Sequence, residues 1–143
     1  MSGREIMEEG MSYKFPSEEW FQRYVDELNG SKEYEEAAKD WEGDFMYVVL
    51  PDKGLEKEYV YYLDLYHGKC RDHYPVENRD ARNAEFMLIG KYSNWRKLGD
   101  GKLDGMRAIL TGKMKLKGNM SKAMRYTKAA AELTKAATRV PTE

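Results

Sequence analysis

The spacing of apolar residues changes from helical to extended near residue 44. Before that point Trp20, Tyr24 and Leu28 recur at every fourth position behind a capping Ser17, which predicts a helix over residues 17–29. Apolar residues at i, i+3, i+4 and i+7 behind Ser31 predict a second helix that ends near Gly43. Both helices carry an apolar stripe that must be buried.

Strand-forming residues dominate the next stretch of the chain. The pattern predicts four strands, at residues 45–50, 58–66, 69–76 and 84–89. In the last of them, Phe86 and Leu88 share one face and Met87 and Ile89 the other. The links are too short for helical crossovers, so we expect the four strands to form an antiparallel meander.

The second half of the chain alternates short elements with glycines. Residues 93–98 and 104–110 predict two short helices. In residues 113–117 Met114 and Leu116 alternate with three lysines, which predicts a fifth strand with an apolar inner face. Asn119 can cap a final helix that runs to about residue 137.

The length of 143 residues fits one domain. We predict a flexible arm over residues 1–12, a single domain over residues 13–138 and a frayed tail over residues 139–143. The longest apolar run, residues 45–50, is too short for a membrane span or a signal-peptide core. A single cysteine, Cys70, excludes an internal disulfide framework. These features favour a cytoplasmic protein.

Charge is spread unevenly although the net charge is −1. Residues 1–90 carry −10 and residues 91–143 carry +9. Either the two halves pack together and neutralise each other, or the basic half forms a surface for phosphates or anionic lipid head groups. The candidates for membrane or head-group contact are Lys113, Lys115, Lys117, Lys122 and Arg125, although lysines here also suit a solvated face that guards a sheet edge.

Three features indicate an apolar cavity. Methionines cluster between residues 106 and 124, and their flexible side chains adapt to irregular apolar partners. The final helix presents Ala and Thr where a core helix usually carries larger side chains, and the first strand is apolar on both faces, so that one face can meet helices and the other a hollow. Each feature also fits a plain, fully packed two-layer core.

The candidates for chemistry are few. His67, Cys70 and His73 lie close in sequence to Asp64 and Asp72, all possible zinc ligands. On an extended strand, however, residues 70 and 73 point to opposite faces, so we expect no metal site and no catalytic residue here. The glycines do not form a phosphate-binding loop. We therefore predict no cofactor.

The stretch after residue 91 carries a family resemblance. Residues 92–101 (YSNWRKLGDG), Leu103, residues 108–120 (AILTGKMKLKGNM), Ala123 and Met124 closely resemble the C-terminal half of sterol-carrier-protein domains. The helix pair over residues 17–42 is similar to the pair that precedes the sheet in single-domain, prokaryotic-type members.

The resemblance implies an α+β fold: a five-stranded, mainly antiparallel sheet with helices packed on one face, enclosing an apolar tunnel. It also implies non-catalytic binding and transfer of a fatty acid, fatty acyl-CoA, phospholipid or sterol-like ligand. The residues expected to line the tunnel are Phe86, Leu88, Trp95, Leu98, Leu103, Met106, Ile109, Leu110, Met114, Leu116, Met120 and Met124.

Two other functions remain open from the residues alone. Tyr-rich strands beside a basic half could bind single-stranded nucleic acid, although a net charge near zero and the absence of an RNA-binding motif argue against a nucleic-acid partner. A small-molecule enzyme or accessory domain could use Asp64, His67 or His73 in a polar pocket. We expect lipid as the ligand, with transient contact to an anionic membrane.

Overall fold

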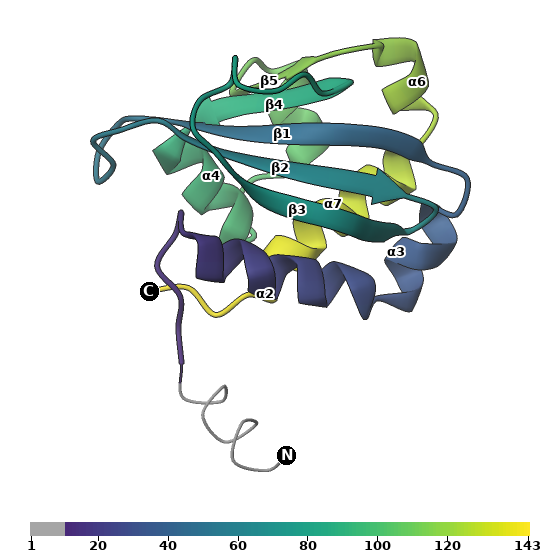
Figure 1. The fold of residues 1–143 in the computed structure, drawn as a ribbon, viewed down its shortest axis with the longest axis horizontal. Helices are drawn as coiled ribbons and strands as arrows, with labels where there is room; N and C mark the ends of the chain where they lie inside the picture. The colour runs from purple at the N-terminus through teal and green to yellow at the C-terminus, as the bar shows by residue number, and fades with distance from the viewer. Residues whose placement is uncertain (1–10) are drawn as a thin grey trace.

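A five-stranded sheet with helices against one face makes up the protein (Figure 1). The computed structural model describes residues 11–143. Along the chain the elements are α2 (Glu18–Asn29), α3 (Lys32–Ala37), β1 (Glu42–Leu50), β2 (Tyr59–Tyr66), β3 (Lys69–Val76), β4 (Phe86–Lys91), α4 (Tyr92–Gly99), α5 (Gly105–Leu110), β5 (Met114–Lys117), α6 (Met120–Met124) and α7 (Thr127–Thr138). The α+β class and the mainly antiparallel sheet that we predicted are confirmed.

The first two helices begin at the predicted caps. The Ser17 hydroxyl accepts a hydrogen bond from the backbone N–H of Trp20, and Ser31 accepts one from Tyr34. Helix α3 ends earlier than predicted, at Ala37. Trp41 therefore lies outside the helix, next to the start of β1. Its carbonyl accepts a hydrogen bond from the N–H of His67, in the residues between the next two strands.

The strand order is β3-β2-β1-β4-β5. Strands β1, β2 and β3 form the predicted antiparallel meander, but the fourth strand does not continue it. Strand β4 pairs parallel to β1, with Phe45 opposite Phe86, and β5 pairs antiparallel to β4. Residues 77–85 carry the chain from one edge of the meander to the other without a helix, which places the most apolar strand at the centre.

The two faces of β1 serve two separate apolar clusters. Phe45, Tyr47 and Val49 pack into the main core on the helix side. Met46 and Val48 belong to a smaller cluster on the opposite face. That face, which we expected to border a hollow, is a core of its own, so any open space must lie on the helix side.

The link over residues 77–85 closes the smaller cluster. The Arg82 guanidinium carbon lies 3.9 Å from the centre of the Tyr62 ring, and the Glu85 N–H donates to the Asp44 carboxylate at 2.7 Å. Ala84 packs against the same cluster. The link thus covers the smaller cluster on the face of the sheet that no helix covers.

The predicted final helix is broken in two. Tyr126, between α6 and α7, leaves the helical conformation with φ −120° and ψ 45°. Its ring packs edge-on against Trp41, with 4.9 Å between the ring centres. Because of this break Met120 and Met124 do not share a stripe with α7, where Ala129 and Ala136 are buried instead.

The C-terminal segment is docked rather than frayed. The Tyr13 N–H donates to the Pro141 carbonyl at 2.8 Å, and the Glu143 N–H donates to the Tyr13 carbonyl at 3.0 Å. Val140 is buried beside them. Most of the predicted N-terminal arm, residues 1–10, lies outside the described residues.

The turn between β2 and β3 requires a glycine. His67 and Gly68 have φ of 50° and 79°, as a two-residue turn with two positive φ angles demands. Helix α3 also passes so close that a Cβ on Gly68 would lie 2.7 Å from the Cα of Glu35. The turn thus fixes the register of the meander and its contact with α3.

Replacement of this glycine tests the close approach. We expect Gly68→Ala to lower the free energy of unfolding by about 2–4 kcal/mol, from the left-handed backbone and the displacement of α3. Gly99→Ala is the control, because a Cβ there meets nothing within 4 Å and Gly99 ends a helix. Urea denaturation measures both; equal stabilities of the two variants would contradict the packing described.

Candidate functional site

An apolar cavity of about 120 Å3 lies between the sheet and the helices. Its sheet wall consists of Phe45, Tyr47, Leu65, Leu88, Met114 and Leu116. Its opposite wall comes from α4 to α7, through Trp95, Leu98, Met106, Ile109, Ala123, Ala129, Ala130, Leu133, Thr134 and Ala137. The lining also includes Phe15, Trp41, Thr142 and residues of α2 and α3.

All three tryptophans of the chain border this cavity. Each indole N–H is already bonded to a protein oxygen at 2.9–3.0 Å: Trp20 to the Thr142 hydroxyl, Trp41 to the Gly43 carbonyl and Trp95 to the Val48 carbonyl. The rings therefore offer apolar faces to the cavity while their polar atoms remain satisfied.

Two buried tyrosines span the cavity region. The Tyr24 hydroxyl donates to the Leu133 carbonyl at 3.0 Å, so it accepts the hydrogen bond from the Tyr47 hydroxyl, also 3.0 Å away. Burial raises the pKa of both phenols well above the usual value. Both side chains are neutral at physiological pH, and their oxygens add no charge to the wall.

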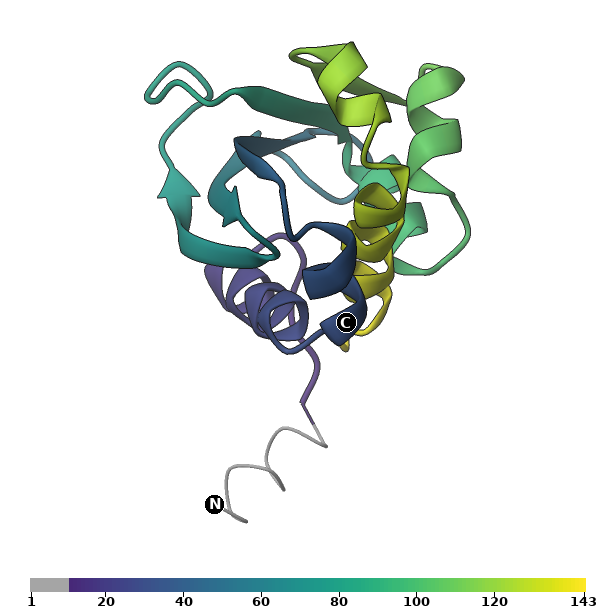
Figure 2. The same ribbon diagram turned by 90° about the vertical axis from the view of Figure 1, so that its right-hand side faces the viewer.

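Small side chains on α7 leave the space open. Ala129, Ala130 and Ala137 face the cavity, as does Thr134, whose hydroxyl lies 3.4 Å from the Ala130 carbonyl of its own helix. The main neighbours of α7 are helices α2, α3, α4 and α5 rather than strands. Figure 2 shows α7 (yellow) beside α3, with most of the strands above and to the left of both helices. The helix is thus held by other helices at a distance from the sheet.

Seven of the residues that we predicted to line the tunnel do border the cavity. They share an inward position on β4, β5 or the helices α4 and α5, and they are Leu88, Trp95, Leu98, Met106, Ile109, Met114 and Leu116. Their position on the cavity side agrees with the inward phase read from the alternating strand and the short helices, and their contact with a ligand stays a prediction.

Five predicted residues lie elsewhere. Phe86 is buried against Trp41, with ring centres 5.3 Å apart, and Leu103 packs in the link before α5. Leu110 is 71% exposed at the end of α5. Met120 and Met124 are 38% and 44% exposed, because the break before α7 turns α6 outward.

The prediction missed the aromatic part of the lining. Phe15, Trp20, Tyr24, Tyr34, Trp41, Phe45 and Tyr47 all border the cavity. The apolar stripe of α2 and the inward phase of β1 mark most of them in the sequence. That pattern alone does not distinguish a cavity wall from a closed core.

The five basic candidates differ in exposure and pairing. Lys113, just before β5, is exposed, as are Lys115 and Lys117 within β5 and Arg125 at the end of α6. Lys122 is engaged: its ammonium lies 2.8 Å from the Glu85 carboxylate and 4.9 Å from the centre of a Trp41 ring. Of the five candidates, Lys122 is thus the one whose charge is engaged, and the other four are exposed.

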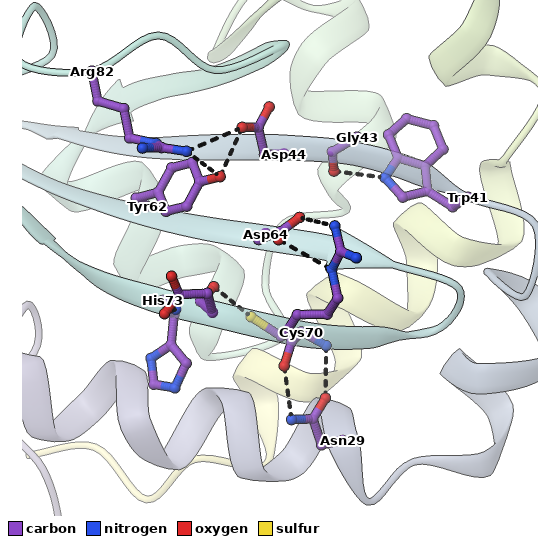
Figure 3. A network of polar contacts seen from close by, with 11 residues as sticks. Asn29, Trp41, Gly43, Asp44, Tyr62, Asp64, Cys70, His73 and Arg82 are labelled. Atoms are coloured by element: carbon purple, nitrogen blue, oxygen red, sulfur yellow. Dashed lines mark hydrogen bonds and ion pairs between the residues drawn. The ribbon is translucent and has the colours of Figure 1, made fainter.

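Cys70 and the two histidines have separate partners, and Figure 3 shows the pairing of Cys70 with Asn29. The Asn29 side-chain amide bonds the backbone of Cys70 on both sides, while His73 bonds the Tyr61 hydroxyl at 2.7 Å and His67 the Glu42 carboxylate at 2.6 Å. Within residues 11–143 no three His, Cys, Asp or Glu side chains are grouped as metal ligands would be.

The Tyr-rich strand β2 turns its central rings inward. Tyr61 and Tyr62 are buried, one in each apolar cluster. Neither presents a free face on which a nucleic-acid base could stack. Among the helices of the described chain, none has the length and apolar character needed to cross a bilayer.

Comparison with known proteins adds a consistent set of similarities. The family model for the SCP-2 sterol transfer family matches residues 21–131. A crystal structure of sterol carrier protein 2 is 35% identical, with a TM-score of 0.81, over 89% of this chain and 99% of the other. No curated protein matches the chain in the sequence comparison.

Two further solved structures extend the likeness. A conserved hypothetical protein from Thermus thermophilus, whose description suggests a sterol carrier protein, is 33% identical over 94% of this chain and 95% of its own, with a TM-score of 0.81. The apo form of sterol carrier protein 2 from Yarrowia lipolytica is 26% identical over 83% and 89%, with a TM-score of 0.55.

The buried thiol next to the cavity region gives a test of the packing. Burial raises the pKa of Cys70 to about 12, although bonds to the backbone of Asp64 and Asp72 oppose this shift. We expect a disulfide reagent at pH 8 to react at least about 100-fold more slowly with the folded protein than with the urea-unfolded chain, because the thiolate is the reactive form.

The raised pKa of Cys70 also predicts how the free energy of unfolding depends on pH. The unfolded thiol ionises near its ordinary pKa of 9.0, whereas the folded thiol does so only near 12, so this contribution to stability is complete below about pH 9 and is lost as the pH rises towards 12. Equal reaction rates for folded and unfolded protein would show that Cys70 is not enclosed.

Proposed function

The chain belongs to the SCP-2 sterol transfer family, and on that basis we propose that it holds the hydrocarbon part of a single lipid in the cavity between the sheet and helices α4 to α7. The observation that carries the proposal is the cavity itself, whose wall is almost wholly apolar. Candidate ligands are a fatty acid, a fatty acyl-CoA, a phospholipid or a sterol-like molecule.

Removal of the ligand from water drives this binding. Each buried CH2 group contributes about 0.8 kcal/mol. A cavity of about 120 Å3 is close in size to an engineered apolar cavity that takes up benzene, so a longer chain must part the walls. The wall most suited to move is α7, which is packed on helices and carries mostly small residues towards the cavity.

The proposed role is to bind and to transfer, not to catalyse. Among the described residues on the cavity wall, only Arg96 and Asp100 carry a charge at neutral pH. The Arg96 guanidinium is bonded to the Tyr92 hydroxyl and the Glu143 carbonyl. This set offers no nucleophile held by a base, which is the arrangement that covalent catalysis requires.

A cavity-filling substitution tests the binding site. Quenching of tryptophan fluorescence by 9,10-dibromostearic acid reports occupancy, since all three tryptophans border the cavity. We expect Ala130→Leu to weaken binding at least about tenfold, because its added carbons occupy the ligand's space. Ala131→Leu is the matched control, since Ala131 is the exposed neighbour on the same helix.

The outcomes of this test are distinct. Equal weakening by both variants would place the ligand outside the cavity. Absence of quenching in the wild-type protein, together with a purified protein that releases no lipid to organic solvent in mass spectrometry, would remove the proposal altogether.

We also propose that the protein docks on anionic membranes through a basic surface formed by residues 105–128. This segment holds seven Lys and Arg residues and no Asp or Glu. It also holds three exposed large apolar side chains, Leu110, Met120 and Met124. Exposed apolar groups within a basic field match the interface of a bilayer with anionic lipids, where cations meet head groups and apolar groups enter the acyl region.

Removal of the β5 charges tests the docking. We expect the triple variant Lys113→Gln, Lys115→Gln, Lys117→Gln to bind phosphatidylglycerol-containing vesicles about 100-fold more weakly, from about 1 kcal/mol for each lysine near the surface. The control is the triple variant Lys32→Gln, Lys53→Gln, Lys57→Gln, which loses the same charge from exposed sites elsewhere. Vesicle sedimentation measures both, and equal losses would mean that only net charge matters.

A further inference from the structure

Three tyrosines from three different elements border the cavity near α3. They are Tyr24 of α2, Tyr34 of α3 and Tyr47 of β1. The Tyr24 hydroxyl gives its hydrogen to the Leu133 carbonyl, and the Tyr47 hydroxyl gives its hydrogen to Tyr24. Tyr47 therefore has no hydrogen left to donate, but its oxygen keeps acceptor capacity.

Tyr34 differs from its two neighbours. Its side chain is 1% exposed, yet its hydroxyl makes no hydrogen bond with any other residue of the described chain. Its oxygen is also not fully enclosed by other protein atoms, and Tyr34 is one of the residues that border the cavity. Burial, with the nearby Tyr47 and Cys70, raises the pKa of this phenol and keeps its hydrogen in place.

An unpartnered buried hydroxyl costs stability, and a phenylalanine in the same place avoids that cost. The hydroxyl of Tyr34 is thus a donor held ready at the cavity wall. Its place in α3 is fixed by the Ser31 cap, which accepts a hydrogen bond from the Tyr34 backbone N–H at 3.0 Å. A ligand atom that accepts this hydrogen bond would meet a preorganised group.

Among the described residues of the cavity wall, none with a charged side chain lies beside the tyrosines at this end. The charged residues on the cavity wall, Arg96 and Asp100, both belong to the region of α4. Helices α3 and α4 lie at opposite ends of the helix layer, with α7 between them (Figure 1). An ionised head group beside Tyr34 would therefore be buried without an opposite charge, whereas an uncharged head group needs none.

We propose that Tyr34 selects a lipid that carries an uncharged hydroxyl group on the end buried near α3, with Tyr34 donating to the ligand oxygen and Tyr47 able to accept from it. A hydroxyl fits because it both accepts and donates one hydrogen bond. The inference rests on the proposed cavity binding and adds to it the chemical class of the ligand and its orientation.

The test compares ligands with the same chain and different ends. Dodecane, 1-dodecanol and dodecanoate each compete with 9,10-dibromostearic acid for the wild-type protein and for Tyr34→Phe. We expect Tyr34→Phe to weaken dodecanol about 3- to 10-fold, the worth of one neutral hydrogen bond, and to leave dodecane and dodecanoate unchanged. The variant should be at least as stable to urea as the wild type, since it loses no protein partner.

Tyr126→Phe is the matched control. Tyr126 also borders the cavity, but its hydroxyl bonds the Asp40 carbonyl, so its removal should not alter the ratio of dodecanol to dodecane affinity. Equal effects of Tyr34→Phe on dodecanol and dodecane would overturn the role of Tyr34 while the cavity proposal stands. Failure of all three ligands to compete would overturn both.

Discussion

The hydroxyl of Tyr24 joins three elements of the protein, α2, β1 and α7, at one point. It binds Tyr47 of β1 on one side and the Leu133 carbonyl of α7 on the other, and its own ring belongs to α2. A protein interior normally collapses to close packing, so a cavity persists only where rigid groups keep its walls apart. The Tyr24 ring and its two hydrogen bonds act as such a spacer between the sheet and the small residues of α7.

The features of the fold that depend on neighbouring residues were predicted from the sequence. Those that depend on contacts between distant residues were not. The caps at Ser17 and Ser31 and the alternation around Leu88 and Met114 are properties of a few neighbouring residues, and the structure confirms them. The parallel pairing of β4 with β1 depends on the path of residues 77–85 across the sheet, which no local pattern encodes. The break at Tyr126 likewise depends on a contact with Trp41, far away in sequence.

Ion pairs between the two halves of the chain account for only part of the charge asymmetry. Lys122 with Glu85 and Arg139 with Glu27 join the basic half to the acidic half, as expected if the halves neutralise each other. Exposed pairs of this kind are worth about 0–1 kcal/mol each, so they add little to stability. The β5 lysines take no part in these two pairs. The candidate basic surface could therefore be only partly predicted from charge, because a sequence gives the number of cations but not which of them are engaged in pairs.

The link from Tyr24 to Leu133 also constrains how the chain folds. The two residues are 109 positions apart in the sequence. In addition, the second edge of β1 stays unpaired until β4 has formed. Contacts this distant favour slow, late closure. A nascent chain that has not yet delivered α7 would leave the aromatic face of α2 and β1 without its cover, so synthesis on the ribosome passes through a long stage in which that surface is open to chaperones or to aggregation.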